Sequence, residues 1–159
     1  LKIATLLPCH VLLTDLDEAL PLLYQNIQLN APNFICGPAA VQAQALRWGA
    51  ATAQDCDSAL AVLSQLSNST FARPILVLAS DCVYFEQLHL PLEETFLSIL
   101  STAPAGSMCL VAGARRWKRD NAFYAKLGKA TRNHSPTHHL VCTCLQETVS
   151  RYHDKDDNG

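Results

Sequence analysis

The stretch HVLLTDLDEALPLLYQNIQLN, residues 10–30, changes its hydrophobic periodicity at one corner. Its first part, residues 10–15, is an apolar run that ends on Asp15, and this pattern predicts a strand. Residues 18–29 predict a helix, because three apolar side chains recur on one face: Leu20, Leu23 and Ile27. A buried strand that turns at once into an amphipathic helix indicates an α/β protein.

Strand-like and helix-like segments continue to alternate along the rest of the chain. We expect further strands at 39–47, 74–80, 107–114 and 139–145, and further helices at 55–67, 91–102 and 119–129. The last of these helices is expected to end at Gly128. Strands separated by helices predict a parallel sheet that is covered on both faces. The domain is expected to span residues 1–150, followed by a polar tail at 151–159.

Composition limits the class of protein. A chain of 159 residues, 49% hydrophobic and 16% charged, fits one domain with a single core. Its net charge of −2 offers no footprint for nucleic acid, and no apolar run approaches the roughly 20 residues of a membrane span. Seven cysteines without a framework spacing, and no secretory signal, favour reduced thiols. We expect a cytoplasmic monomer, with the nucleus as the alternative compartment, and neither nucleic acid nor membrane as partner.

The residues that close the strands form the candidate ligand site, because sheets of this kind bind ligands beyond the carboxyl ends of their strands. A carboxylate at Asp15 can accept hydrogen bonds from both hydroxyls of a nucleotide ribose. The alternative for Asp15 is a helix N-cap. Pro21 is tolerated only near a first helical turn, so we expect the helix to begin at Asp17 or Glu18. Asp17 is then the better cap, and the ribose role is favoured for Asp15.

A second polar cluster lies where the stretch VLASDCVYFEQLHLPL leaves its buried strand. Asp81 and Tyr84 are three residues apart in the turn, so that one carboxylate and one phenol can point into the same cleft. By spacing alone, a purely structural role fits each residue equally well. Asp81 can simply start a turn, and Tyr84 can pack at the edge of the core.

Four blocks together resemble a known family: HVLLTDLDEALPLLYQNIQLN, QALRWG, VLASDCVYFE and ARRWKRDNAFYAKL. Their order and spacing, from residue 1 to about 130, are similar to those of the seven-strand protein-lysine methyltransferases of the methyltransferase-like 21 group, lysine methyltransferase family 16. The resemblance implies a Rossmann-like fold that binds S-adenosylmethionine. It also implies methyl transfer to a lysine of a protein substrate, since relatives act on chaperones and on elongation or other ATP-dependent factors.

The resemblance also implies a role for each strand-end residue. Asp15 matches the acidic residue on the cofactor ribose. Trp48, in the family's WG motif, matches a residue beside the adenine, and Ser80 matches the small residue near the methionine part of the cofactor. Asp81 and Tyr84 match the family's DxxY motif at the substrate lysine.

Methyl transfer to lysine explains why a carboxylate and a phenol are needed. The nucleophile is a neutral amine, whereas free lysine, with a pKa of about 10.4, is charged at neutral pH. Asp81 can anchor the arriving ammonium, and the positive sulfonium of the cofactor disfavours the charge on that amine. Tyr84 can orient the nitrogen lone pair toward the methyl group. The reaction requires no metal ion and no covalent nucleophile.

The sequence departs from the family pattern at its start. Members carry a glycine-rich loop after a first strand, whereas residues 1–7 match the helix that follows this loop. We therefore expect an N-terminally truncated fold with the first strand and the Gly-rich loop absent. The missing strand would lie between those that end at Asp15 and Ser80. The alternative function is a non-catalytic remnant or interaction module derived from this fold.

Two further motifs allow both a functional and a structural role. HHLVCTC brings together His138, His139, Cys142 and Cys144. Because no second ligand pair with metal-site spacing exists, a strand face is favoured over a zinc site. RRWKRD, residues 115–120, is favoured as a solvated helix start over a nucleic-acid contact.

Overall fold

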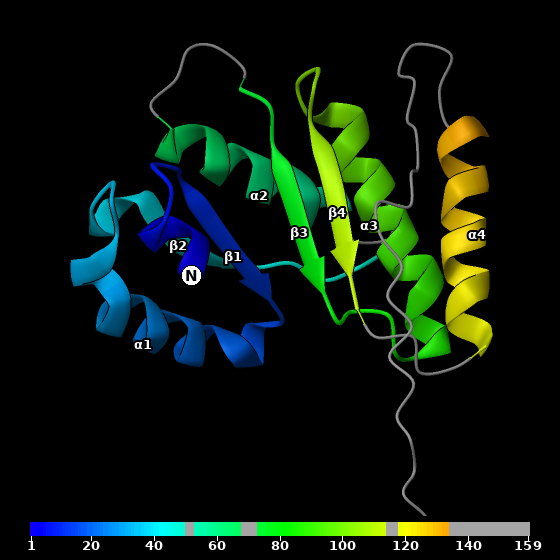
Figure 1. The fold of residues 1–159 in the computed structure, drawn as a ribbon, viewed down its shortest axis with the longest axis horizontal. Coiled ribbons are helices and arrows are strands. Elements are labelled where there is room, and N and C mark those ends of the chain that lie inside the picture. Colours follow the sequence, from blue (N-terminus) through cyan, green and yellow to red (C-terminus); the bar gives the residue numbers. More distant parts are fainter. Residues whose placement is uncertain (50–52, 68–72, 114–117, 134–159) are drawn as a thin grey trace, which may run out of the picture.

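The computed structural model describes residues 1–49, 53–67, 73–113 and 118–133 (Figure 1). Strands and α-helices alternate along these ranges: β1 (Val11–Asp15), α1 (Leu20–Asn30), β2 (Val41–Ala45), α2 (Ala53–Leu66), β3 (Leu76–Ser80), α3 (His89–Thr102), β4 (Met108–Ala112) and α4 (Lys118–Asn133). The predicted α/β alternation is confirmed. The strand predicted at 139–145 and the polar tail lie outside the described residues.

The strands form two parallel pairs. β1 pairs with β2 in a register that runs from Val11 opposite Val41 to Asp15 opposite Ala45. β3 pairs with β4 in a register that ends with Ser80 opposite Ala112. Figure 1 shows β1 and β3 pointing in the same direction, yet within the described residues they belong to separate two-stranded sheets. Parallel pairing is therefore confirmed, whereas one continuous sheet is not found in this part of the chain.

Helix α2 supports both strand pairs. It contacts β1 and β2 directly. Cys56 of α2 is 1% exposed and is buried together with Leu46, which follows β2, and Ile99 of α3. Leu60 of α2 and Val77 of β3 pack against this cluster. In Figure 1, α2 runs behind β3 and β4. Helix α2 therefore links the two pairs, by direct contact with β1 and β2 and through the shared cluster with β3.

One face of the β3–β4 pair is uncovered in the described part of the chain. Successive side chains of a strand point to opposite faces, and Val77 and Ala79 face the helical core. The alternate positions carry exposed apolar side chains: Leu76, Leu78, Met108 and Leu110. Within the described residues, the helices that contact this pair lie on one side only, so the prediction that both faces are covered is not confirmed here.

The helix after β1 has the predicted buried face and a different start. Leu20, Leu23 and Ile27 pack in one cluster with Ala4, Phe34 and Val41. A short 3-10 helix occupies Asp17–Ala19, and α1 begins at Leu20 with Pro21 in its first turn. No side-chain hydrogen bond caps either element, so the cap predicted at Asp17 is wrong. The 3-10 turn starts at Asp17 itself, which leaves Leu16 at the cap position.

Helix α4 continues beyond its predicted end. It runs through Gly128 to Asn133, because a glycine costs only about 1 kcal/mol within a helix and does not by itself end one. Buried Phe123 and Leu127 of α4 pack against Leu92 and Phe96 of α3. None of the described helices has the length and apolar character needed to cross a membrane.

Candidate functional site

Asp15 lies exposed at the carboxyl end of β1. Its Oδ1 atom accepts a hydrogen bond from the backbone N–H of Leu16 at 2.8 Å. Neither the 3-10 turn at Asp17–Ala19 nor α1 takes a side-chain cap. The structure therefore does not support the helix-cap alternative for Asp15. The ribose role stays a prediction that this position allows.

The end of β3 carries an unusual backbone conformation. Ser80 is the last residue of the strand, and Asp81 follows with a φ of +59°. Among the described residues other than glycine, Asp81 alone has a positive φ. The Asp81 N–H donates to the carbonyl oxygen of Ala112 at 2.7 Å, which extends the ladder with β4 by one residue. Aspartate tolerates the left-handed region better than most residues, and such strain is frequent at functional sites.

The pKa of the Cys82 thiol is influenced by both predicted carboxylates, Asp81 and Asp15. Burial raises the pKa of Cys82, and the negative charges of Asp81 and then of Asp15 raise it further. The thiol itself donates to the carbonyl oxygen of Ser80 at 3.4 Å. Asp15 and Asp81 thus stand at the carboxyl ends of β1 and β3, and both lie within electrostatic reach of the Cys82 thiol. We use the name acidic edge below for Asp15, Ser80, Asp81 and Cys82.

Trp48 lies in the turn after β2 and is half-buried. It packs against the core cluster between β3, α3 and α4: Ala79, Val83, Leu92, Phe96, Phe123 and Leu127. Cys82 packs against the same cluster. The turn that carries Trp48 and the turn that carries Asp81 therefore rest on one core, although 33 residues of sequence separate the two residues.

Tyr84 is 37% exposed, and its ring contacts that of Phe85 with centroids 4.7 Å apart and planes tilted by 59°. Phe85 is itself 54% exposed. Tyr84 is therefore not part of a buried cluster, and its packing partner is a second accessible ring. Both residues precede the 3-10 turn Glu86–Leu88 that leads into α3.

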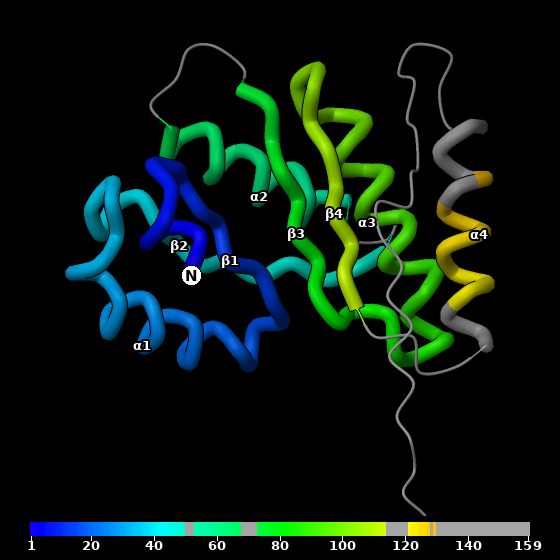
Figure 2. The backbone as a smooth tube through the Cα atoms, in the orientation of Figure 1, coloured from blue at the N-terminus to red at the C-terminus, as the bar shows by residue number. Residues whose placement is uncertain are grey.

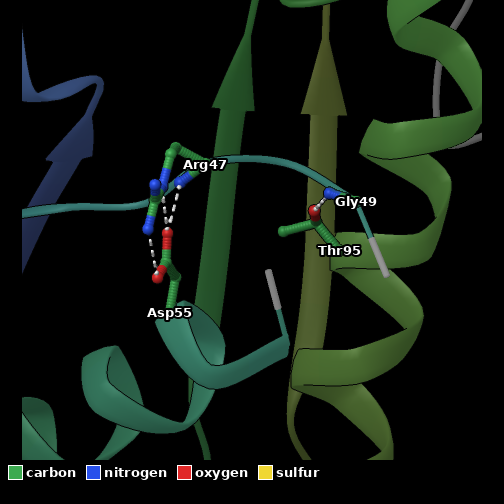
Figure 3. Close-up of polar contacts among 4 residues, drawn as sticks. All are labelled: Arg47, Gly49, Asp55 and Thr95. Carbon is green, nitrogen blue, oxygen red and sulfur yellow. Dashed lines mark hydrogen bonds and ion pairs between the residues drawn. The ribbon is translucent and has the colours of Figure 1, made fainter. Parts of the chain in front are cut away.

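Two contacts on either side of Trp48 are not indicated by the sequence (Figure 3). Arg47 donates from Nε and Nη2 to the two carboxylate oxygens of Asp55 at 2.8 and 3.1 Å, which lowers the pKa of Asp55. The N–H of Gly49 donates to Oγ1 of Thr95 at 3.0 Å. Both contacts join residues on different elements, so no local periodicity reveals them. The turn 47–49 is thus fixed to α2 on one side and to α3 on the other.

A family profile described as lysine methyltransferase matches residues 1–130. The chain belongs to this family. It is 33% identical, over 117 residues, to the protein-lysine N-methyltransferase EFM6 of Saccharomyces cerevisiae. This alignment covers 74% of the present chain and 43% of EFM6, so the chain spans less than half the length of that relative. No solved structure gives a significant match.

The match to the lysine methyltransferase family confirms the family predicted from the four sequence blocks, and enzymatic activity of this chain stays a prediction. The mixed α/β arrangement of the described residues agrees with a methyltransferase-like fold. The narrower methyltransferase-like 21 group stays a prediction. The roles of Asp15, Trp48, Ser80, Asp81 and Tyr84 also stay predictions, although the structure brings Asp15, Ser80 and Asp81 to one edge and seats Trp48 on the core beneath it.

The alternative motifs fall largely outside the described residues. The side chains of 115–120 and of 138–144 are not described, so the structure does not test the basic run or the zinc alternative. Among the side chains that are described, no group of three or more histidine, cysteine, aspartate or glutamate residues is arranged to hold a metal ion.

Proposed function

We propose that the protein transfers a methyl group from S-adenosylmethionine to a lysine side chain of a protein substrate. The observation that carries this proposal is the acidic edge, where the carboxylates of Asp15 and Asp81 act on the same thiol at the ends of two parallel strand pairs. Family membership supports the lysine methyltransferase chemistry. Methyltransferases of this kind generally use S-adenosylmethionine, whose sulfonium is positive and would be attracted to such an edge.

The residues at the acidic edge fit the parts of this cofactor. Asp15 is exposed, and a carboxylate is a strong acceptor for two ribose hydroxyls. Trp48 offers a half-buried aromatic surface for the adenine. Ser80 ends β3 beside the left-handed Asp81, so that the backbone there would lie near the methionine part. When bound, the cofactor supplies an activated methyl group on its sulfonium.

Asp81 and Tyr84 would hold the substrate lysine. The Asp81 carboxylate attracts the lysine as an ammonium, which is its form in water. Tyr84 lies three residues further along and exposes its phenol, whose oxygen can accept or donate a hydrogen bond. Together they would fix the direction from which the amine approaches once it has lost its proton.

A further strand between β1 and β3 belongs to the proposed Rossmann-like fold. Within the described residues, β1 and β3 each pair on one edge only, and both point in the same direction. Because α2 supports both pairs, a parallel strand placed between them would join the pairs into one sheet. Without such a strand, a non-catalytic interaction module is the alternative function.

The test is transfer of a tritiated methyl group from S-adenosylmethionine to lysate proteins of cells that lack the endogenous protein. We expect the full-length protein to label a lysine-containing substrate. Asp81→Asn and Tyr84→Phe should each lower labelling on the order of tenfold to a hundredfold, while cofactor affinity changes little. Asp57→Asn, at an exposed carboxylate on α2, is the matched control.

Each outcome of this experiment is informative. Equal labelling by both variants and the parent would remove Asp81 and Tyr84 from the site. A matched loss of cofactor affinity would move Asp81 into the cofactor pocket. Absence of labelling by a parent protein that folds would overturn the enzymatic function and favour the interaction module.

A further inference from the structure

The segment after β2 crosses from one strand pair to the helix that supports the other. Figure 2 shows the tube leaving β2 and passing behind β3 and β4 to reach α3. Trp48 lies in the middle of this crossing, between Arg47 and Gly49. Besides the packing of Trp48 against the core cluster, the position of its ring depends on what holds the crossing at α3.

Thr95 of α3 makes the contact that holds it (Figure 3). Thr95 is 2% exposed, and its Oγ1 atom donates to the carbonyl oxygen of Pro91 at 2.9 Å. A threonine within a helix commonly makes this bond to the residue four positions earlier. The same Oγ1 also accepts the N–H of Gly49 at 3.0 Å, from 46 residues away in the sequence. The Thr95 hydroxyl thus donates one hydrogen bond within its helix and accepts a second one from the crossing.

The backbone conformation of Gly49 suits the contact between the crossing and α3. Its φ of +121° lies in a region that side-chain-bearing residues rarely adopt. A Cβ atom at this position would stand 3.6 Å from the Cβ of Pro91 and 3.8 Å from its Cα, so the backbone of the turn lies directly against the first turns of α3. The conformation of Gly49 and the bond to Thr95 therefore fix the same short piece of chain.

The other attachment of the crossing is more open to water. The Arg47 side chain is 58% exposed in its ion pair with Asp55, whose side chain is 17% exposed. Exposed ion pairs contribute little, because water and salt compete for both charges. Thr95 is shielded from this competition. Of these two polar attachments, the bond between Thr95 and Gly49 is the more shielded from water, and it acts together with the packing of Trp48 against the core cluster.

We propose that Thr95 is a positioning residue for the cofactor, which acts by holding the Trp48–Gly49 turn on α3 so that the Trp48 ring stands ready beside the acidic edge. This inference rests on the proposed function, since it concerns the adenine side of the same site. Thr95 does not touch the cofactor or the lysine in this role. Its effect reaches the site through Trp48.

The experiment uses the full-length protein with Trp117→Phe, which leaves Trp48 as the one tryptophan of the 159 residues. Thr95→Val keeps the shape and removes the hydroxyl, and Thr95→Ser keeps the hydroxyl. Three quantities are measured: acrylamide quenching of Trp48 fluorescence without ligand, the Kd for S-adenosylhomocysteine by titration calorimetry, and the kcat of methyl transfer at saturating cofactor. Thr102→Val is the matched control, because it removes a similar bond, to Ser98 at 3.1 Å, from the same helix without touching the crossing.

We expect Thr95→Val to increase the quenching of Trp48 and to raise the Kd about tenfold, the effect of roughly one hydrogen bond. The kcat at saturating cofactor should stay within about twofold, because the lysine side of the site is unchanged. Thr95→Ser and Thr102→Val should behave as the parent. Gly49→Ala displaces the same turn without altering α3, and should reproduce the pattern of Thr95→Val if that variant folds poorly.

Unchanged quenching and unchanged Kd in Thr95→Val would overturn the inference. A Thr95→Val protein with increased quenching but unchanged Kd would also overturn it, because the turn would then move without consequence for the cofactor. A parent that binds no S-adenosylhomocysteine would instead contradict the proposed function, and in that case the quenching alone would still show whether Thr95 holds Trp48.

Discussion

Asp15→Asn separates the charge of Asp15 from its local structural role. The side chain lies exposed at the end of β1, where Oδ1 accepts the N–H of Leu16 at 2.8 Å. An asparagine keeps the shape and one oxygen for this bond, but it has no charge and one acceptor fewer. Hydrogen bonds to charged groups contribute about 1.5–3 kcal/mol each, so the loss of one ribose bond should raise the Kd for the cofactor about 10- to 150-fold.

The stability of the protein should change far less. Leu16 is 53% exposed, so water can reach its N–H, and an exposed substitution of this kind alters the free energy of unfolding by about 0.5 kcal/mol or less. A second effect is independent of any ligand. Because the charge of Asp15 contributes to the raised pKa of Cys82, that pKa should move down toward its usual value in Asp15→Asn.

Three measurements test these expectations: cofactor titration, thermal unfolding, and the pH dependence of thiol alkylation at Cys82. Asp17→Asn is the matched control, since Asp17 is an exposed carboxylate two residues away whose side chain caps no helix. The reasoning would be refuted by an unchanged Kd together with a lowered melting temperature, since Asp15 would then serve the turn after β1. An equal loss of affinity in Asp17→Asn would also refute it, because any nearby negative charge would then be sufficient.

Two further predictions concern the fold around the site. Leu92→Ala, at a side chain that is 1% exposed in the same core cluster as Val83, should lower the free energy of unfolding by about 2–5 kcal/mol in a denaturant titration. Leu90→Ala, on the same helix but 49% exposed, should change it by about 0.5 kcal/mol or less. The Arg47 guanidinium lowers the pKa of Asp55 in the folded protein, so this pair contributes stability above the ordinary pKa of an aspartate, about 4, and loses it as the pH falls through the lowered value. The difference in unfolding midpoint between the parent and Asp55→Asn should therefore shrink below about pH 4 and stay constant above about pH 6, and a difference that grew on acidification would contradict the assignment.

The parts of the fold that local periodicity governs follow from the sequence. The helix face of Leu20, Leu23 and Ile27 is found as predicted, because a helix needs one apolar stripe to join a core. The strand ends at Asp15 and Ser80 are also found at the predicted residues, since a polar side chain after an apolar run marks where the chain leaves the core.

Other features depend on contacts that lie far apart in the sequence. The hydrogen bond from Gly49 to Thr95 spans 46 residues, and the local sequence around neither residue predicts it. The left-handed conformation of Asp81 is equally hidden, because an aspartate in a turn usually needs no positive φ. The exposed side chains of Leu76 and Leu78 belong to a segment whose sequence is typical of a strand buried on both faces. Composition alone does not show which face of such a strand is covered by another element.

The half-paired strands have a consequence for how the isolated chain behaves at high concentration. Along their second edges, β1 and β3 present peptide N–H and C=O groups that no described strand takes up. Water can solvate such groups, but a strand from a neighbouring molecule can bind them as well, and the adjacent leucines would gain apolar contact in the same event. Self-association should therefore begin at β3, where, among the described residues, an unpaired strand edge and an exposed apolar face coincide.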